Sequence, residues 1–138
     1  MTVRFSRAAY DELVAHGREG APREVCGVLG GSNGTDRTVH EVRRVENVAR
    51  RPHSRYELDA SGQFEAMSAI ERAGHEVVGF YHSHPNGPPR PSGTDRAEAC
   101  WEEYAYVILA LGGEPFVGAW RLTGDGFEAE RVTVDGLG

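Results

Sequence analysis

The alternation of apolar and polar residues along the chain predicts two amphipathic helices. In the first, from Ser6 to Arg18, the apolar side chains share one helical side, and the Ser6 hydroxyl is suited to cap the first turn. The second is predicted to end at Ala73, with Asp59 or Ser61 as its cap. Its expected inward-facing residues are Phe64, Met67, Ala69 and Ile70.

Short apolar segments between turn residues predict a series of β-strands. Residues 24–31 form an apolar run bounded by glycines, and residues 38–48 are expected to return beside it as a hairpin. The run that begins at Val77 leads into His82 and His84. Further strands are predicted at 104–111, 115–123 and 127–134. Helices interspersed with a mostly antiparallel meander indicate a mixed α/β domain.

Length, composition and charge restrict the class of protein. A chain of 138 residues is expected to form a single domain, 1–138, and it contains neither a long apolar span nor a signal-peptide core. Two cysteines give no disulfide framework, so a cytoplasmic location is expected. The net charge of −6 counts against nucleic-acid binding. The arginine pairs at 43–44 and 50–51 are interpreted as a solvated strand edge and loop, with contact to an acidic protein partner as the alternative.

The segment His82-Ser83-His84-Pro85 carries the main chemical signal. Successive side chains of a strand point to opposite faces, so His82 and His84 are expected on the same face. Two imidazoles with a third oxygen ligand are typical of catalytic zinc sites, which keep one coordination position open. Asp95 is the natural third ligand. The four prolines in residues 85–91 stiffen the loop that returns it, and a helix capped by Ser92 or Thr94 is predicted to follow through residues 96–101.

Glu24, His82-Ser83-His84-Pro85, Ser92 and Asp95 together resemble the signature of the JAMM (MPN+) zinc metalloproteases. That signature is a glutamate on an early strand, then H-[ST]-H-P, and S-x-x-D with seven residues between the second histidine and the serine; every position matches here. The resemblance implies an α/β fold with a curved mixed β-sheet flanked by helices. It further implies zinc ligation by His82, His84 and Asp95, with Glu24 as general base and acid and Ser92 as oxyanion stabiliser.

The same resemblance implies a substrate class. Family members hydrolyse the bond that follows the Gly-Gly tail of a ubiquitin-like modifier, and this compact chain is most similar to stand-alone archaeal desampylases, which release modifiers from lysines. The alternative is the activity of bacterial relatives, which trim a C-terminal cysteine from a sulfur-carrier protein.

Other classes are less well supported. A non-catalytic MPN binding module conflicts with the intact ligand set. A RadC-type domain shares a similar motif, but the acidic balance and the lack of a helical DNA-binding region count against it. A zinc nucleoside deaminase would need H-x-E with P-C-x-x-C, and the chain has neither.

Overall fold

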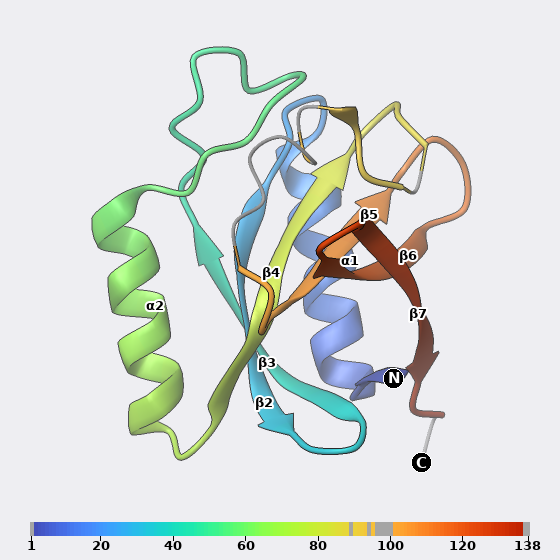
Figure 1. Ribbon diagram of the computed structural model, residues 1–138. Helices are drawn as coiled ribbons and strands as arrows, with labels where there is room; N and C mark the ends of the chain where they lie inside the picture. Colours follow the sequence, from blue (N-terminus) through green and yellow to red (C-terminus); the bar gives the residue numbers. More distant parts are fainter. Residues whose placement is uncertain (1, 89, 94, 96–100, 137–138) are drawn as a thin grey trace.

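The computed structural model describes residues 2–88, 90–93, 95 and 101–136. Seven strands and two helices follow one another along the described chain (Figure 1). Their bounds are β1 Thr2–Phe5, α1 Arg7–Gly20, β2 Cys26–Asn33, β3 Arg37–Val45, α2 Ala60–Arg72, β4 Glu76–His84, β5 Ala105–Ala110, β6 Phe116–Thr123 and β7 Gly126–Val134. The predicted helix over residues 96–101 lies mostly outside the described residues.

The strands form one mixed sheet that closes on itself in the order β1-β3-β2-β4-β5-β6-β7, with β7 paired to β1. The pairs β1–β3, β1–β7 and β4–β5 are parallel and the others are antiparallel. The mixed sheet with two helices agrees with the expected fold class. The expectation of a mostly antiparallel meander missed both β1 and the closure, because a four-residue segment carries too little periodicity to be identified alone.

The two helices pack on opposite faces of the central strands, and each face has its own apolar core. α1 covers a cluster that includes Leu29, Val78 and Tyr81, whereas α2 covers one that includes Val28 and Phe80. Because side chains alternate along a strand, His82 and His84 follow Phe80 onto the face of α2. Ser83 lies on the opposite face, so β4 supplies the candidate site from only one of its sides.

The helix starts agree with the sequence. Ser6 caps α1 by accepting a hydrogen bond from the Ala9 amide, and Asp59 rather than Ser61 caps α2 by accepting one from Gly62. The inward orientation of Phe64 was wrong: this side chain is 73% exposed, and Ala66 and Ile70 are the buried residues of α2. The apolar stripe of α2 is narrow, and one of its two buried positions is an alanine.

No helix in the described part of the chain is long and apolar enough to cross a bilayer.

Candidate metal centre

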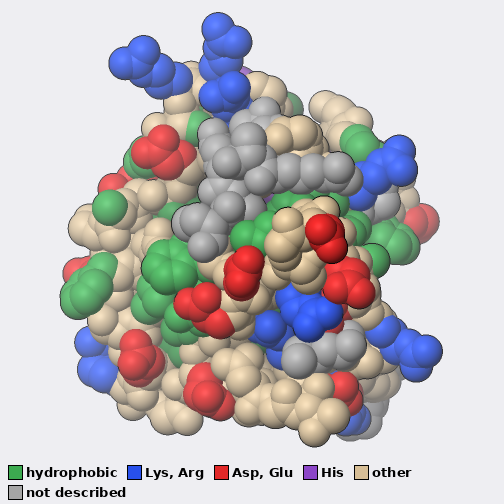
Figure 2. Space-filling model, in the orientation of Figure 1, with side chains coloured by type: hydrophobic (Ala, Val, Ile, Leu, Met, Phe, Trp, Pro, Cys, Tyr) green, Lys and Arg blue, Asp and Glu red, His purple; other side chains and the backbone are tan. Residues whose placement is uncertain are grey.

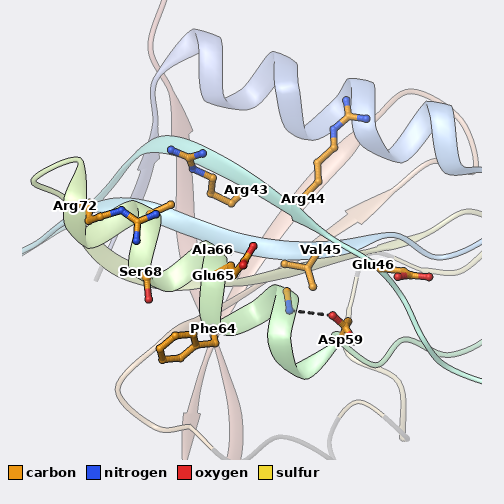
Figure 3. Close-up of a pocket in the computed structure, with 12 residues that line it drawn as sticks. Arg43, Arg44, Val45, Glu46, Asp59, Phe64, Glu65, Ala66, Ser68 and Arg72 are labelled. Atoms are coloured by element: carbon orange, nitrogen blue, oxygen red, sulfur yellow. Dashed lines mark hydrogen bonds between the residues drawn. The ribbon is translucent and has the colours of Figure 1, made fainter.

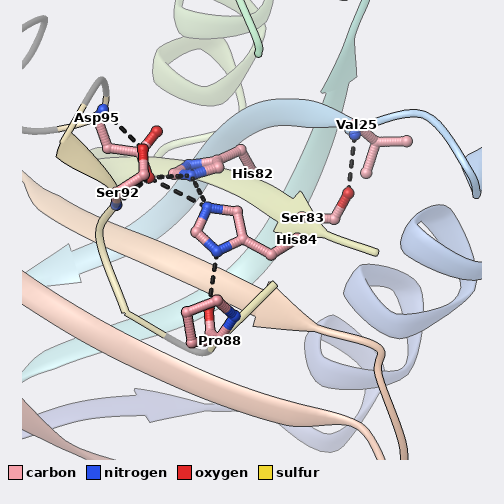
Figure 4. Close-up of polar contacts among 7 residues, drawn as sticks. All are labelled: Val25, His82, Ser83, His84, Pro88, Ser92 and Asp95. Carbon is pink, nitrogen blue, oxygen red and sulfur yellow. Dashed lines mark hydrogen bonds and ion pairs between the residues drawn. The ribbon is translucent and has the colours of Figure 1, made fainter. Parts of the chain in front are cut away.

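The ends of β4 and of the proline-rich loop bring three candidate ligands together (Figure 4). The Nε2 atoms of His82 and His84 are 3.1 Å apart, and each lies 3.1 Å from Oδ2 of Asp95. All three side chains are buried. Ligand atoms held 2.0–2.2 Å from a tetrahedral zinc lie roughly 3.3–3.6 Å from one another. The observed triangle therefore has nearly the dimensions of a zinc-ligand face.

The protonation of His84 is fixed by its second ring nitrogen. Nδ1 lies 2.8 Å from the Pro88 carbonyl oxygen, which can only accept a hydrogen bond, so Nδ1 carries the proton. In the neutral ring Nε2 is then the unprotonated nitrogen, and its lone pair is available to a cation. A metal-binding histidine is usually oriented by a hydrogen bond from its second ring nitrogen to a carbonyl or carboxylate oxygen. This donor set has lone pairs converging on one point, and it fits a divalent cation.

The electrostatics of the site favour a neutral His82 beside an ionised Asp95. Burial lowers the pKa of His82, despite its contact with Asp95. Burial also disfavours charge on His84, but the Asp95 and Pro88 contacts outweigh it and raise its pKa. Burial opposes ionisation of Asp95 as well, yet the hydrogen bonds from both imidazoles and the Ser92 amide hold its pKa well below the usual range.

Ser92 and Asp95 hold each other in a tight reciprocal turn. The Ser92 amide donates to Asp95 Oδ2 at 2.8 Å, and the Asp95 amide donates to the Ser92 hydroxyl oxygen at 3.0 Å. These bonds orient the carboxylate toward the histidines. Ser92 itself is exposed.

Glu24 lies beside the histidines, but not within a strand as predicted. β2 begins two residues later, at Cys26, because the backbone of Glu24 is paired elsewhere. Its amide donates to the Pro52 carbonyl oxygen at 2.6 Å, and its own carbonyl accepts from the Asn47 side chain at 2.8 Å. Ligand-type atoms of Glu24, His82 and His84 lie within 4.8 Å of one another.

The Glu24 carboxyl group is set up to exchange a proton near neutral pH. It is buried, and its Oε1 atom has no hydrogen-bond partner among the described residues. Burial raises the pKa of Glu24 to about 7; Asp95 adds to the shift and His84 opposes it. A general base works best when its pKa is near the working pH.

Three residues at the centre were not identified from the sequence. The ring of Tyr56 stacks on His82, Asn47 anchors Glu24, and the Ser83 hydroxyl accepts a hydrogen bond from the Val25 amide at 2.9 Å. Ser83 could have been suspected from its place between the histidines. Tyr56 and Asn47 belong to a loop without periodicity or motif, so no signal pointed to them.

Cys26 pairs in register with His82 but is not part of the centre. Its thiol is buried and contacts the Val45 carbonyl oxygen at 3.6 Å, and burial raises its pKa to about 12. It acts as a small core residue.

Comparison with known proteins agrees with this arrangement. The desampylase of Haloferax volcanii is 45% identical over 131 residues, which cover 92% of each chain. The CysO-cysteine peptidase of Mycobacterium tuberculosis is 37% identical over 98 residues, covering 71% of this chain and 66% of that protein. A solution structure of a protein from Desulfitobacterium hafniense superposes with a TM-score of 0.88 at 29% identity, covering 96% of this chain and 92% of that one.

The family model of prokaryotic homologs of the JAB domain matches residues 6–123, which include all five residues of the predicted signature. The chain belongs to the prokaryotic JAB-domain family of JAMM-type metalloproteases.

Proposed function

We propose that this protein is a zinc-dependent isopeptidase that releases ubiquitin-like modifiers from the lysine side chains of target proteins. The observation that carries the proposal is the convergence of His82, His84 and Asp95 beside a buried carboxylate oxygen of Glu24, which has no hydrogen-bond partner among the described residues. A ligand triangle alone would suit a structural metal. A carboxyl group with a pKa near 7 next to it adds a means of moving protons.

His82, His84 and Asp95 are the proposed zinc ligands, through Nε2, Nε2 and Oδ2. When bound, zinc lowers the pKa of a coordinated water toward about 7 and polarises a carbonyl oxygen. The Pro88 carbonyl and the Ser92 amide keep two of these ligands in their orientations, so the site needs little rearrangement to bind the ion.

Glu24 is the proposed proton carrier. Its Oε1 atom accepts a proton from the attacking water, and the same oxygen then delivers the proton to the departing lysine amine. Asn47 and the Pro52 carbonyl hold the Glu24 backbone from both sides, so the carboxyl group stays over the centre during both transfers.

Ser92 is the proposed oxyanion donor. Its oxygen already accepts from the Asp95 amide, which leaves the hydroxyl proton free to donate to the negative charge that develops on the scissile carbonyl. Removing a donor of this kind typically lowers the rate by about 10²–10³.

The lysine conjugate is preferred over the cysteine-extended carrier as the substrate. The desampylase matches with higher identity, and over more of both chains, than the CysO-cysteine peptidase. An extended Gly-Gly tail suits the site because it can approach the metal with its backbone and add hydrogen bonds along a strand. We expect the enzyme to act in the cytoplasm, on ubiquitin-like modifiers and their conjugates.

The test uses zinc-loaded enzyme and two substrates built on one modifier. The first joins its terminal glycine to a lysine side chain of a reporter protein, and the second extends the modifier by one cysteine. We expect the lysine conjugate to be cut between glycine and lysine, EDTA to abolish release, and added zinc to restore it. Valine in place of the last glycine should block cleavage without changing zinc content.

Efficient cutting of the cysteine extension alone would assign the protein to the sulfur-carrier peptidases. If zinc-loaded enzyme leaves both substrates intact, the hydrolase proposal is wrong and a binding role replaces it.

A further inference from the structure

The loop between β3 and α2 is the basic part of an acidic protein. The chain has a net charge of −6, yet residues 47–56 contain three arginines and no carboxylate. Arg50, Arg51 and Arg55 are exposed, and none of them forms an ion pair with a described residue. Figure 2 shows basic side chains projecting at the end of the molecule where this loop lies in Figure 1.

A groove in this loop borders the metal centre. It has a volume of about 580 Å³, and Tyr56 forms part of its wall. The same ring lies on His82, with centroids 4.0 Å apart, so the groove and the candidate ligands share one side chain. Its lining residues are Val48, Ala49, Arg50, Arg51, Arg55, Tyr56 and Glu57.

The loop is held in shape by its own hydrogen bonds. Asn47 donates to the carbonyls of Glu24 and Arg55, and its side-chain oxygen accepts from the amides of Ala49 and Glu57. The Arg51 carbonyl oxygen accepts from the amide of Arg55 at 2.9 Å. The arginines therefore start from a fixed backbone, which lowers the ordering cost when a partner binds.

The hollow between α2 and β3 offers no comparable surface (Figure 3). Its volume is about 550 Å³, but its charges are mixed, because Glu46, Asp59 and Glu65 also line it. Two of its arginines are already paired, Arg43 with Glu41 and Arg44 with carboxylates of α1. The groove next to His82, by contrast, is lined by three arginines that form no ion pair with a described residue.

We propose that the loop of residues 47–57 is the docking surface for an acidic face on the folded body of the modifier whose tail enters the metal centre. This inference rests on the proposed function. The positive charge of the loop attracts an acidic modifier, while the acidic remainder of the enzyme repels it and disfavours other binding orientations. The loop also borders the proposed zinc ligands. The folded body of a modifier whose short tail ends at the metal can therefore contact it.

The modifier, rather than the target protein, is the matching partner. Every conjugate of one modifier presents the same folded body, whereas the surroundings of the acceptor lysine differ between targets. A preformed basic groove can therefore contribute to the binding of every conjugate only if it contacts the modifier, which all conjugates share. An acidic patch on a particular target would add affinity for that target alone.

The experiment compares two substrates that carry the same scissile bond. One is an acidic ubiquitin-like modifier joined through its terminal glycine to a lysine-containing reporter peptide. The other is only the tail of that modifier, a short peptide ending in Gly-Gly, joined to the same reporter. For Arg50→Glu/Arg51→Glu, the ratio of kcat/KM on the folded conjugate to kcat/KM on the tail peptide should fall at least tenfold, mainly through KM.

A matched control makes the same change in net charge elsewhere. Arg72→Glu/Arg131→Glu reverses two exposed arginines, at the end of α2 and on β7, that do not border the groove. It should shift the ratio less than twofold. The wild-type ratio should also fall as salt rises from 50 to 500 mM, and this slope should flatten in the Arg50/Arg51 variant. Equal ratios for both variants would overturn the docking surface.

Direct binding separates this inference from the proposed function. The free folded modifier is titrated into zinc-loaded enzyme and into both variants, and affinity is measured by calorimetry. Binding at least tenfold weaker in the Arg50/Arg51 variant supports the surface, and unchanged binding in that variant overturns it. Failure of wild-type enzyme to cut either substrate would instead overturn the proposed function, and the binding result would then decide the docking surface on its own.

Discussion

The ring of Tyr56 lies flat on the imidazole of His82, with centroids 4.0 Å apart and planes 15° apart. The contact joins a surface loop to a buried strand residue, and it covers the face of one proposed zinc ligand. Aromatic contacts of this kind contribute about 0.5–1.5 kcal/mol beyond the area they bury. Tyr56 therefore restricts rotation of the His82 ring and excludes water from one side of it.

Replacing Tyr56 with alanine should weaken zinc binding by up to roughly tenfold, since an energy of 0.5–1.5 kcal/mol corresponds to that range. Phenylalanine at the same position should keep near wild-type affinity, because it retains the ring. Competition with a chromogenic chelator measures both variants. Equal zinc affinity for alanine and phenylalanine would show that the stack does not orient His82.

Wild-type protein should hold one zinc per chain, and His84→Ala should hold much less than one. The substitution removes one of the three proposed ligands, so that only His82 and Asp95 are left to hold the ion. Elemental analysis after dialysis gives the stoichiometry, and a thermal melt checks that the variant is folded. Undiminished zinc in a folded His84→Ala protein would remove His84 from the ligand set.

Glu24→Gln should retain zinc and lose about 10²–10⁴ in kcat, because glutamine has nearly the same shape but cannot carry the proton. Single-turnover cleavage of the lysine conjugate measures the rate. Glu46→Gln is the control, since it removes the charge of an exposed glutamate near the same loop. Activity within a few-fold of wild type would assign the base to another group.

Asn47→Ala should lower kcat while leaving zinc stoichiometry unchanged, because Asn47 anchors the backbone of the proposed base rather than a ligand. Its side chain makes four hydrogen bonds, so some loss of stability is expected as well, about 1–3 kcal/mol for each buried group left unpaired. The informative readout is the acidic limb of the pH profile of kcat. It should shift in Asn47→Ala if Glu24 moves, and a purely structural role would leave it in place.

Folding stability should fall as the pH drops from about 6.5 to 4 because of His16. Its Nδ1 lies 2.7 Å from the Tyr81 hydroxyl oxygen, and burial, with a contribution from Arg44, lowers its pKa to about 4. An unfolded histidine titrates near 6.5, so in this window the unfolded chain binds more protons than the folded one. The stability that the low pKa of folded His16 contributes is fully present above pH 6.5 and is lost as the pH falls toward 4.

Urea denaturation at several pH values tests the His16 prediction. His16→Gln should be less stable at pH 8, and its stability should decline less between pH 6.5 and 4.5 than that of the wild type. Parallel curves for the two proteins would show that His16 does not titrate with folding.

The sequence predicted those features that rest on local rules. The cap of α1 at Ser6 follows from the hydrogen-bonding preference of a serine before an apolar-periodic run. The shared face of His82 and His84 follows from the two-residue period of a strand. Asp95 could be assigned because proline restricts the backbone, so a short proline-rich loop can return in few ways.

Features that depend on distant segments were not accessible. Phe64 is apolar and falls within an amphipathic pattern, yet α2 buries Ala66 and Ile70 and leaves Phe64 exposed. The closure through β1 joins residues 2–5 to residues 131–134, a pairing that no local pattern encodes.

By itself, the sequence determined which residue types form the candidate ligand set, their spacing and the common face of the two histidines, because these depend on backbone periods and on side-chain chemistry within fourteen residues. The tertiary structure decided where Glu24 lies: the loop of residues 47–57 pairs with its backbone, and burial raises the pKa of its carboxyl group. Burial and hydrogen bonding between remote segments are properties of the packed chain. They convert a glutamate that looked like an ordinary strand-end residue into the best candidate for the base.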